Sequence, residues 1–321
     1  MMKKNKIRLL LLMMCIFCAT IFMCACGEKD ESKEGVSIVA TIFPAYDFSR
    51  QIALDNANIE LLIKPGSEVH SYEPSPQDII KINECDIFIY TGGENDKWVD
   101  EILKSVDNDD LIIIKMVDCV ELFEEEVIEG MEEEEEEHGD EEGDETEWDE
   151  HVWTSPKNAI KISKVIKEKL FEIDEANNEK YEENLKTYTE KLELLDKEIR
   201  ETVSNAKRNV LLFADRFPAR YFVEEYNLKY YAAFPGCSSE TEPSASVIAY
   251  LVDKIKNENI PAILKIELSN GNVADVISGE TGAKILTFSS CHNLTKEEFS
   301  AGKTYIDIMY ENLDVLKIAL N

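Results

Sequence analysis

Short apolar runs alternate along this chain with helical stretches, and one long helical tract divides the alternation into two halves. In the long tract, apolar residues recur at spacings of four, three, four, three, four and four, which marks one face of a helix. These residues are Tyr181, Leu185, Tyr188, Leu192, Leu195, Ile199 and Val203. A helix over residues 178–206 would be about 43 Å long. The pattern predicts two α/β halves joined by this helix, with a coiled-coil segment as the alternative for the tract.

The strand-like runs are short and rich in Ile, Val, Leu and Phe. They lie at residues 37–42, 59–63, 86–90 and 111–114 before the long tract, and at 210–213, 229–234, 262–266 and 284–288 after it. Strands separated by helical stretches of ten or more residues indicate parallel pairing, and continuous apolar runs fit strands buried on both faces. The expected fold class is therefore α/β with two parallel sheets. Ligands of such sheets bind beyond the carboxyl ends of the strands.

The first 25 residues have the pattern of an export signal. A basic start with Lys3, Lys4 and Arg8 precedes an apolar run over residues 9–23, which is too short to predict a membrane span. The run ends at Ala25 and Cys26, and this resembles a bacterial lipoprotein signal in which Cys26 is acylated. An ordinary signal peptide or a single anchor helix is the alternative. The prediction is an extracytoplasmic protein anchored by lipid to the cell membrane of a bacterium, with residues 26–35 as a flexible tether.

The remaining boundaries follow from the same patterns. We expect an N-terminal α/β lobe over residues 36–177, a linking helix over 178–206 and a C-terminal α/β lobe over 207–321. The N-terminal lobe includes an acidic loop at 121–150.

The net charge of −32 is concentrated in that acidic loop. Residues 121–150 hold nineteen Asp or Glu and no Lys or Arg, so the rest of the chain carries −13. Like charges at this density repel and cannot form a core, which predicts disorder. The loop would either collect cations or be a solvated segment without a specific role. An acidic protein is not expected to bind nucleic acid, whose phosphates need Lys and Arg.

Two of the four histidines lie in segments with fixed loop geometry. His70 is part of Pro65-Gly66-Ser67-Glu68-Val69-His70-Ser71-Tyr72-Glu73-Pro74-Ser75-Pro76, and His151 is part of Asp149-Glu150-His151-Val152-Trp153-Thr154-Ser155-Pro156. Imidazole beside carboxylates is a ligand set that suits Zn²⁺ and similar divalent ions. Proline and glycine around each histidine indicate a preformed loop. A loop histidine bonded to a backbone carbonyl is the alternative, but the flanking pattern favours a metal ligand.

At these residues the chain resembles the zinc/manganese-type substrate-binding lipoproteins of ABC importers. The resemblance includes both histidine motifs, the 86–98 segment, the long helix and Glu242-Pro243-Ser244, and it covers essentially the whole chain after the signal. It implies two Rossmann-like lobes bridged by a rigid helix, with metal held in the cleft between them. It also implies an ABC permease in the membrane as partner and a monomeric receptor.

The resemblance assigns the first two ligands to His70 and His151. The third ligand of the family, usually His or Glu, falls at Arg216, which cannot bind a cation. Asp215, one residue away, could supply an oxygen ligand to the metal ion. Alternatively, Asp215 could form an ion pair with a neighbouring arginine. The fourth ligand of the family falls near residues 289–292, where His292 is the candidate. With three histidines, Zn²⁺ is expected ahead of Mn²⁺ as the transported ion.

Four cysteines remain after the signal, and sequence alone allows three pairings among them. Cys85 and Cys119 adjoin apolar strands and resemble small core residues, whereas Cys237 and Cys291 lie in loop-like segments. A bridge between Cys237 and Cys291 is the expected pairing, because disulfides form outside the cytoplasm.

Three other functions compete with a metal receptor. A zinc-dependent hydrolase would need three ligands, an open position and a general base, but the chain has no His-Glu-x-x-His, Gly-x-Ser-x-Gly or Walker motif. A receptor for a siderophore or corrin would need a cleft lined by aromatic residues and arginine. Cell adhesion is a further role that residue patterns do not address.

Overall fold

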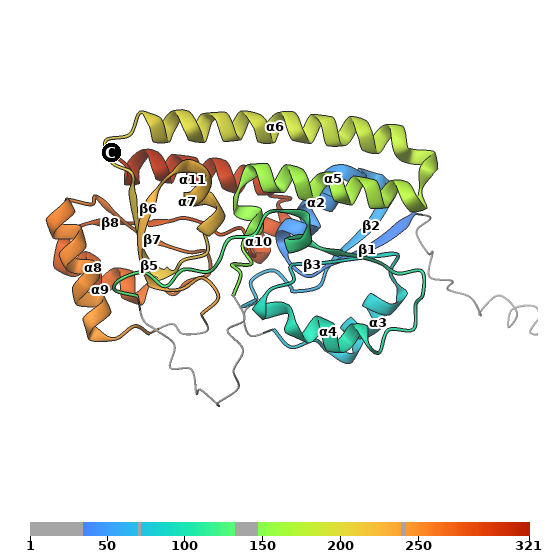
Figure 1. Ribbon diagram of the computed structural model, residues 1–321, viewed down its shortest axis with the longest axis horizontal. Coiled ribbons are helices and arrows are strands. Elements are labelled where there is room, and N and C mark those ends of the chain that lie inside the picture. The colour runs from blue at the N-terminus through green and yellow to red at the C-terminus, as the bar shows by residue number, and fades with distance from the viewer. Residues whose placement is uncertain (1–34, 70–71, 132–146, 239–241) are drawn as a thin grey trace, which may run out of the picture. The chain divides into compact units, whose positions relative to one another are not determined.

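Two parallel sheets of four strands each carry the fold, as the alternation predicts (Figure 1). The computed structural model describes residues 35–69, 72–131, 147–238 and 242–321. The strand orders are β2-β1-β3-β4 and β6-β5-β7-β8, with parallel pairing throughout. The strands are β1 (Val36–Ala40), β2 (Ala57–Leu61), β3 (Ile87–Tyr90), β4 (Ile112–Lys115), β5 (Val210–Arg216), β6 (Lys229–Phe234), β7 (Ala262–Lys265) and β8 (Lys284–Thr287).

Helices connect the strands in each half. They are α2 (Phe43–Ala53), α3 (Pro76–Glu84), α4 (Lys97–Leu103), α5 (Pro156–Ile173), α6 (Asn178–Ser204), α7 (Arg220–Tyr226), α8 (Ala245–Glu258), α9 (Asn272–Thr281), α10 (Lys296–Ser300) and α11 (Tyr305–Ala319). The sequence patterns did not predict α5 or α10. Both begin at clear caps: the Ser155 side chain accepts from the Asn158 amide ahead of Pro156, and Thr295 forms a capping box with Glu298.

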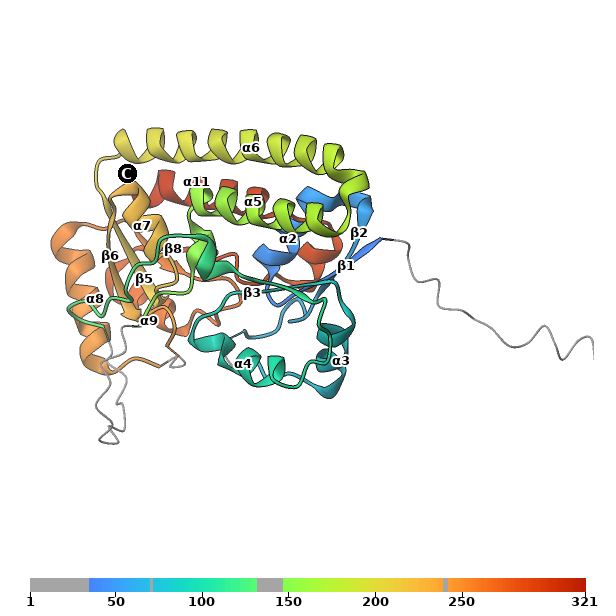
Figure 2. The same ribbon diagram turned by 45° about the vertical axis from the view of Figure 1, so that its right-hand side comes forward.

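The long helix α6 runs above both sheets (Figures 1 and 2), and its bounds confirm the predicted tract to within two residues. Six of the seven residues on its predicted apolar face are buried; Val203 is partly buried. One continuous apolar core lies beneath α6 and includes Phe48 from the first half, Leu192 from α6 and Phe213 from the second half. The helix therefore joins the two halves through shared packing as well as through the chain.

The opposite face of each sheet has its own smaller core. In the first half, Ile82 of α3 and Val99 of α4 pack against Phe88 of β3. In the second half, α8 and α9 cover the sheet through a cluster that includes Leu212, Leu251 and Ile277. Because helices cover both faces, the strands are buried on both sides, which explains their continuous apolar runs.

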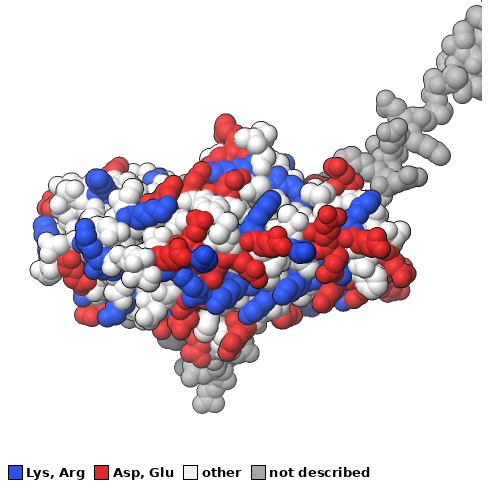
Figure 3. All heavy atoms as spheres, turned by 90° about the horizontal axis from the view of Figure 1, so that it is seen from above, with Lys and Arg blue, Asp and Glu red and all other residues white. Residues whose placement is uncertain are grey.

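The outward face of α6 carries both signs of charge. Figure 3 shows lysines and acidic residues interspersed along this face rather than gathered into a field of one sign. Exposed Lys186, Glu190 and Lys197 lie on it. Such a mixed surface fits a solvated helix face.

The end of the chain returns to the first half after β8. The Phe43 amide donates to the carbonyl of His292 (3.3 Å), and the Gly66 amide donates to that of Leu294 (2.8 Å). The Tyr305 amide, at the start of α11, donates to buried Asp47 of α2 (2.8 Å). Residues 36–321 thus form one compact unit, and the division of the chain into lobes at 177 and 207 stays a prediction.

The predicted lipoprotein signal with Cys26 lies outside the described residues. Within the described ranges, no helix is both long enough and apolar enough to cross a membrane.

Candidate metal centre

His151 lies at the end of a short antiparallel ribbon and just before α5. The ribbon pairs Glu124 with Trp148, and a 3-10 turn over Val152–Thr154 follows the histidine. The imidazole is fully buried. Asp149 Oδ1 accepts a hydrogen bond from the His151 amide (2.8 Å) and lies 3.1 Å from its Nδ1. A carboxylate at Nδ1 favours the tautomer with a proton there, which leaves Nε2 as the metal-binding atom.

The charges around His151 also change its acidity. Burial lowers the pKa of the imidazole, but the charge and hydrogen bond of Asp149, followed by the charges of Glu150 and Glu125, outweigh burial and raise the pKa above 6.5. The neutral form that binds metal is therefore reached at a higher pH than for an ordinary histidine.

Asp149 is itself held by both halves of the fold. Its carbonyl accepts from the hydroxyl of Tyr221 on α7 (2.7 Å), and its amide donates to the carbonyl of Phe123 (3.0 Å). Its neighbour Glu150 is buried but bonds elsewhere: it accepts from the amide (3.2 Å) and Nδ2 (2.5 Å) of Asn95. Burial raises the pKa of Glu150 to about 7. Asp149, rather than Glu150, is the carboxylate that orients the histidine.

His292 lies in the loop between β8 and α10, and a partly buried acid, Glu267, holds that loop. The Glu267 carboxylate accepts from the Ser290 amide (2.7 Å), the Ser290 hydroxyl (2.5 Å) and the His292 amide (2.9 Å). Between these two amides, Cys291 has a left-handed φ of 62°. Successive amides around a left-handed residue form a concave anion site, which Glu267 fills from within the protein. Glu267 follows β7 and so fixes the direction of His292.

The two imidazoles lie side by side although 141 positions separate them in the sequence. Their ring centroids are 5.5 Å apart at an angle of 81°. Two imidazoles bound to one tetrahedral zinc, each with its nitrogen 2.0–2.1 Å away, would have centroids about 5.2 Å apart. Trp153 packs against both rings and donates from Nε1 to the carbonyl of Ser290 (2.8 Å). The spacing suits a shared ion.

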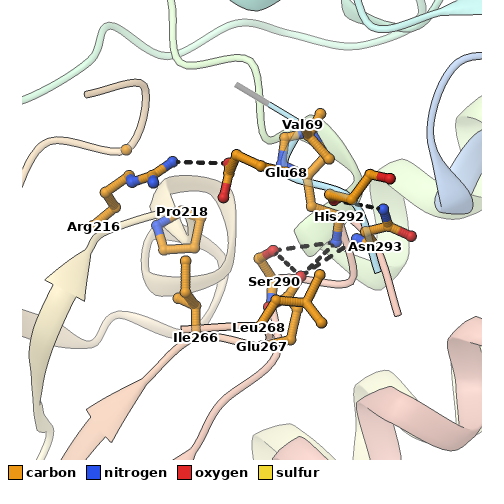
Figure 4. Close-up of a pocket in the computed structure, with 12 residues that line it drawn as sticks. Glu68, Val69, Arg216, Pro218, Ile266, Glu267, Leu268, Ser290, His292 and Asn293 are labelled. Atoms are coloured by element: carbon orange, nitrogen blue, oxygen red, sulfur yellow. Dashed lines mark hydrogen bonds and ion pairs between the residues drawn. The ribbon is translucent and has the colours of Figure 1, made fainter. Parts of the chain in front are cut away.

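A small cavity of about 30 Å³ adjoins His292 (Figure 4). It is lined by Ser67, Glu68 and Val69 from the first half and by Arg216, Pro218, Gly236, Ile266, Glu267, Leu268, Ser290, His292 and Asn293 from the second. A Cβ at Gly236 would lie 3.2 Å from Cε1 of His151, so His151 is directly behind this glycine. His70 lies outside the described residues, and the residue before it, Val69, lines the cavity.

At the carboxyl end of β5, Arg216 and not Asp215 lines this cavity. The Arg216 side chain is 7% exposed, and its Nη1 lies 3.4 Å from Oε1 of Glu68. Asp215 Oδ1 accepts from the Arg216 amide, and Oδ2 is buried without a hydrogen-bond partner among the described residues. The sheet register shifts between Phe213 and Arg216, an irregularity that the sequence pattern does not reveal.

The expected bridge between Cys237 and Cys291 is wrong for this structure, in which both are free thiols. They lie in different surroundings. Acids near Cys237 include Glu150, Asp149 and Glu125, whereas Cys291 is enclosed near Glu267 and Asp47. Burial raises the pKa of both thiols well above the ordinary value, so neither is readily available as a thiolate ligand. Cys85 is buried and Cys119 partly buried, as expected for small core residues.

Among the described residues, no group of three or more His, Cys, Asp or Glu side chains is placed to hold a metal ion. The described part of the site therefore contributes two histidines. The predicted third histidine, His70, lies outside the described residues. Sequence reasoning missed Asp149 and Glu267 as partners of the histidines. The sequence position of each acid could have indicated this role: Asp149 lies two residues before His151, and Glu267 directly follows an apolar strand.

The fold and the site define the class of this protein: an α/β protein of two parallel sheets, with a pair of neighbouring histidines between its two halves. The model of one family, described as zinc-uptake complex component A, periplasmic, matches residues 38–319. The chain belongs to this family.

Known relatives cover most of this chain. The zinc-binding lipoprotein AdcA of Streptococcus pneumoniae serotype 4 is 36% identical over 315 residues, which is 98% of this chain and 60% of AdcA. The chain thus spans about 60% of the length of the AdcA relatives. The high-affinity zinc uptake system protein ZnuA of Bacillus subtilis is 35% identical over 295 residues, 92% of this chain and 90% of ZnuA. The crystal structure of the Zn(II)-bound ZnuA-like domain of S. pneumoniae AdcA superposes with a TM-score of 0.73 at 33% identity and covers 89% of this chain and 99% of that domain.

Proposed function

We propose that this protein is a receptor that binds Zn²⁺ outside the cytoplasm and delivers it to an ABC permease in the membrane. The observation that carries the proposal is the pair of imidazoles from His151 and His292, whose centroids lie 5.5 Å apart beside the small cavity. Membership of the zinc-uptake component A family, and zinc-binding relatives such as AdcA, support zinc as the cargo.

In this proposal His70, His151 and His292 bind the ion, and Cys26 carries the lipid that keeps a monomeric receptor at the membrane. Asp149 and Glu267 orient two of the imidazoles. Asp215 stays the candidate for a fourth ligand from the protein, because its Oδ2 is buried without a hydrogen-bond partner among the described residues. Mn²⁺ is the second candidate cargo, and a predominance of imidazole over carboxylate ligands favours zinc over manganese.

Metal analysis of the purified protein and calorimetric titration of the metal-free form with Zn²⁺ and Mn²⁺ test the proposal. We expect tight zinc binding with one ion per protein. The variants His151→Ala and His292→Ala should each lose it, whereas His138→Ala, the same change at the histidine of the acidic loop, should not. Micromolar or weaker binding of both ions by the wild-type protein would contradict the proposal.

A further inference from the structure

Arg216 places a buried positive charge in the cavity that His292 lines. Figure 4 shows its guanidinium above Pro218 and Ile266, joined to Glu68 and on the far side of Glu68 from His292. A guanidinium stays protonated at any pH that a protein tolerates. A cavity proposed for a divalent cation therefore contains a permanent cation from the protein, and the two charges repel each other through a medium that screens them poorly.

The partners of Arg216 do not use all of its donors. Within the described part of the chain, Arg216 forms an ion pair with Glu68. This ion pair is long at 3.4 Å, and the Glu68 side chain is 52% exposed. The Nε of Arg216 is buried and has no hydrogen-bond partner within the described ranges. A buried donor without a partner destabilises the folded protein, and more so when the group is charged. The described residues thus leave the Nε–H group of Arg216 without an acceptor.

We propose that Arg216 binds a small monoanion of halide size, and that this anion and the metal ion occupy the cavity together. The inference rests on the proposed function as a metal receptor. An acceptor at Nε would satisfy the buried donor, and its negative charge would offset the repulsion between the guanidinium and the metal ion. Each ligand then strengthens the binding of the other by the same factor.

The cavity sets the size of the anion. One water-sized group needs about 10–15 Å³ of such space, so a cavity of about 30 Å³ admits roughly two groups of that size. A metal ion and one chloride-sized anion fit, and a bulky anion does not. This distinguishes a specific site from general screening by salt, which acts with any anion.

Calorimetric zinc titrations in sodium chloride and in sodium methanesulfonate, at equal ionic strength, test this prediction. The wild-type protein should bind zinc about fivefold or more tightly in chloride, the lower end of ordinary coupling between sites. Arg216→Gln should bind zinc with the same Kd in both salts, after the weak complexation of zinc by chloride, which affects both proteins equally, is allowed for. Arg220→Gln changes an arginine outside the cavity and should keep the chloride effect.

Equal affinities of the wild-type protein in the two salts, or an equal chloride effect in Arg216→Gln, would overturn the inference and leave the receptor function intact. Failure of the wild-type protein to bind zinc in either salt would instead overturn the proposed function. Crystals of the wild-type protein grown in bromide give a test without any variant. Anomalous scattering should place bromide within hydrogen-bonding distance of Nε of Arg216, and its absence there contradicts the inference even if Arg216→Gln fails to fold.

Discussion

At the scale of single residues, Asp149 controls both the direction and the acidity of the His151 imidazole. Its Oδ1 contacts the amide and Nδ1 of the histidine, while Tyr221 and Phe123 hold its backbone. Carboxylates that accept from a metal-binding histidine fix the ring and increase its basicity. This arrangement leads to two predictions about zinc affinity.

Asp149→Asn should weaken zinc binding about 10- to 100-fold, the range typical of such partners, because the amide keeps the shape of the side chain but removes its charge. Calorimetric titration of zinc measures the change. Glu150→Gln is the matched control, since Glu150 is equally buried but bonds to Asn95. Equal losses of affinity in the two variants would show that buried charge alone matters and that the contact with Nδ1 does not.

The raised pKa of His151 predicts how zinc affinity depends on pH. Burial lowers this pKa, but Asp149, Glu150 and Glu125 raise it above 6.5 overall. Protons should therefore compete with zinc already above pH 6.5, and affinity should fall as the pH decreases through the raised value. Removing the Asp149 charge lowers the pKa, so in Asp149→Asn this fall should begin at a lower pH. Titrations from pH 8 to 5.5 measure both curves, and an unchanged midpoint in the variant would contradict the assignment.

The stability of the metal-free protein should show the opposite trend. Because folding raises the pKa of His151, the folded state binds this proton more tightly than the unfolded state does. The contribution of His151 to the free energy of unfolding is full below pH 6.5 and is lost as the pH rises through the raised value. The difference between wild-type protein and His151→Ala in urea unfolding isolates this contribution, and it should shrink from pH 6 to pH 8.

At the scale of structural elements, the loop between β8 and α10 depends on Glu267. Glu267→Gln replaces one acceptor oxygen by an NH₂ group that faces backbone donors, so we expect a loss of about 1–3 kcal/mol in the free energy of unfolding. Zinc affinity should fall as well, because His292 loses its fixed position. Urea unfolding and calorimetry measure the two effects. Glu280→Gln, an exposed acid on α9, should change neither, and full zinc affinity in Glu267→Gln would exclude a positioning role.

The helix α6 provides a second test at this scale. Leu192 is fully buried in the core that joins the two sheets, whereas Leu194, two residues away, is 50% exposed. Leu192→Ala should lower the free energy of unfolding by about 2–5 kcal/mol, while Leu194→Ala should change it by less than about 0.5 kcal/mol. Similar values for the two variants would mean that α6 is not packed as the structure describes.

Periodicity predicted these elements well, because the covered sheets require continuous apolar strands and α6 requires one apolar face. The site was harder to predict. His151 was a candidate because of its flanking loop, and His292 because the family resemblance places a fourth ligand near it. Their partners were not predicted, since an acid two residues before a histidine or just after a strand has no distinctive pattern. The direction of Arg216 depends on a register shift in β5, and the arrangement of Cys237 and Cys291 depends on tertiary packing. These features arise from contacts between distant segments.

At the scale of the whole molecule, the acidic loop separates into structural flanks and a central part. The flanks, residues 121–131 and 147–150, contain Phe123, Asp149 and Glu150, which pack or bond beside His151. The sequence predicts disorder for all of residues 121–150. This prediction is wrong for the flanks, because an antiparallel pairing and contacts with Tyr221 order them. Residues 132–146 lie outside the described residues.

This division changes what a deletion should do. Replacing residues 132–146 by a short Gly-Ser linker removes eleven acidic residues and should leave the zinc Kd within about twofold, because the ligands and Asp149 remain. Deleting all of residues 121–150 should abolish tight binding, since Asp149 and the ribbon that positions His151 are lost. Calorimetry at physiological ionic strength compares the two proteins, with circular dichroism as the control for folding. Loss of tight binding in the shorter deletion would mean that the central acids contribute directly to the metal site and that a centre built only from His70, His151 and His292 is incomplete.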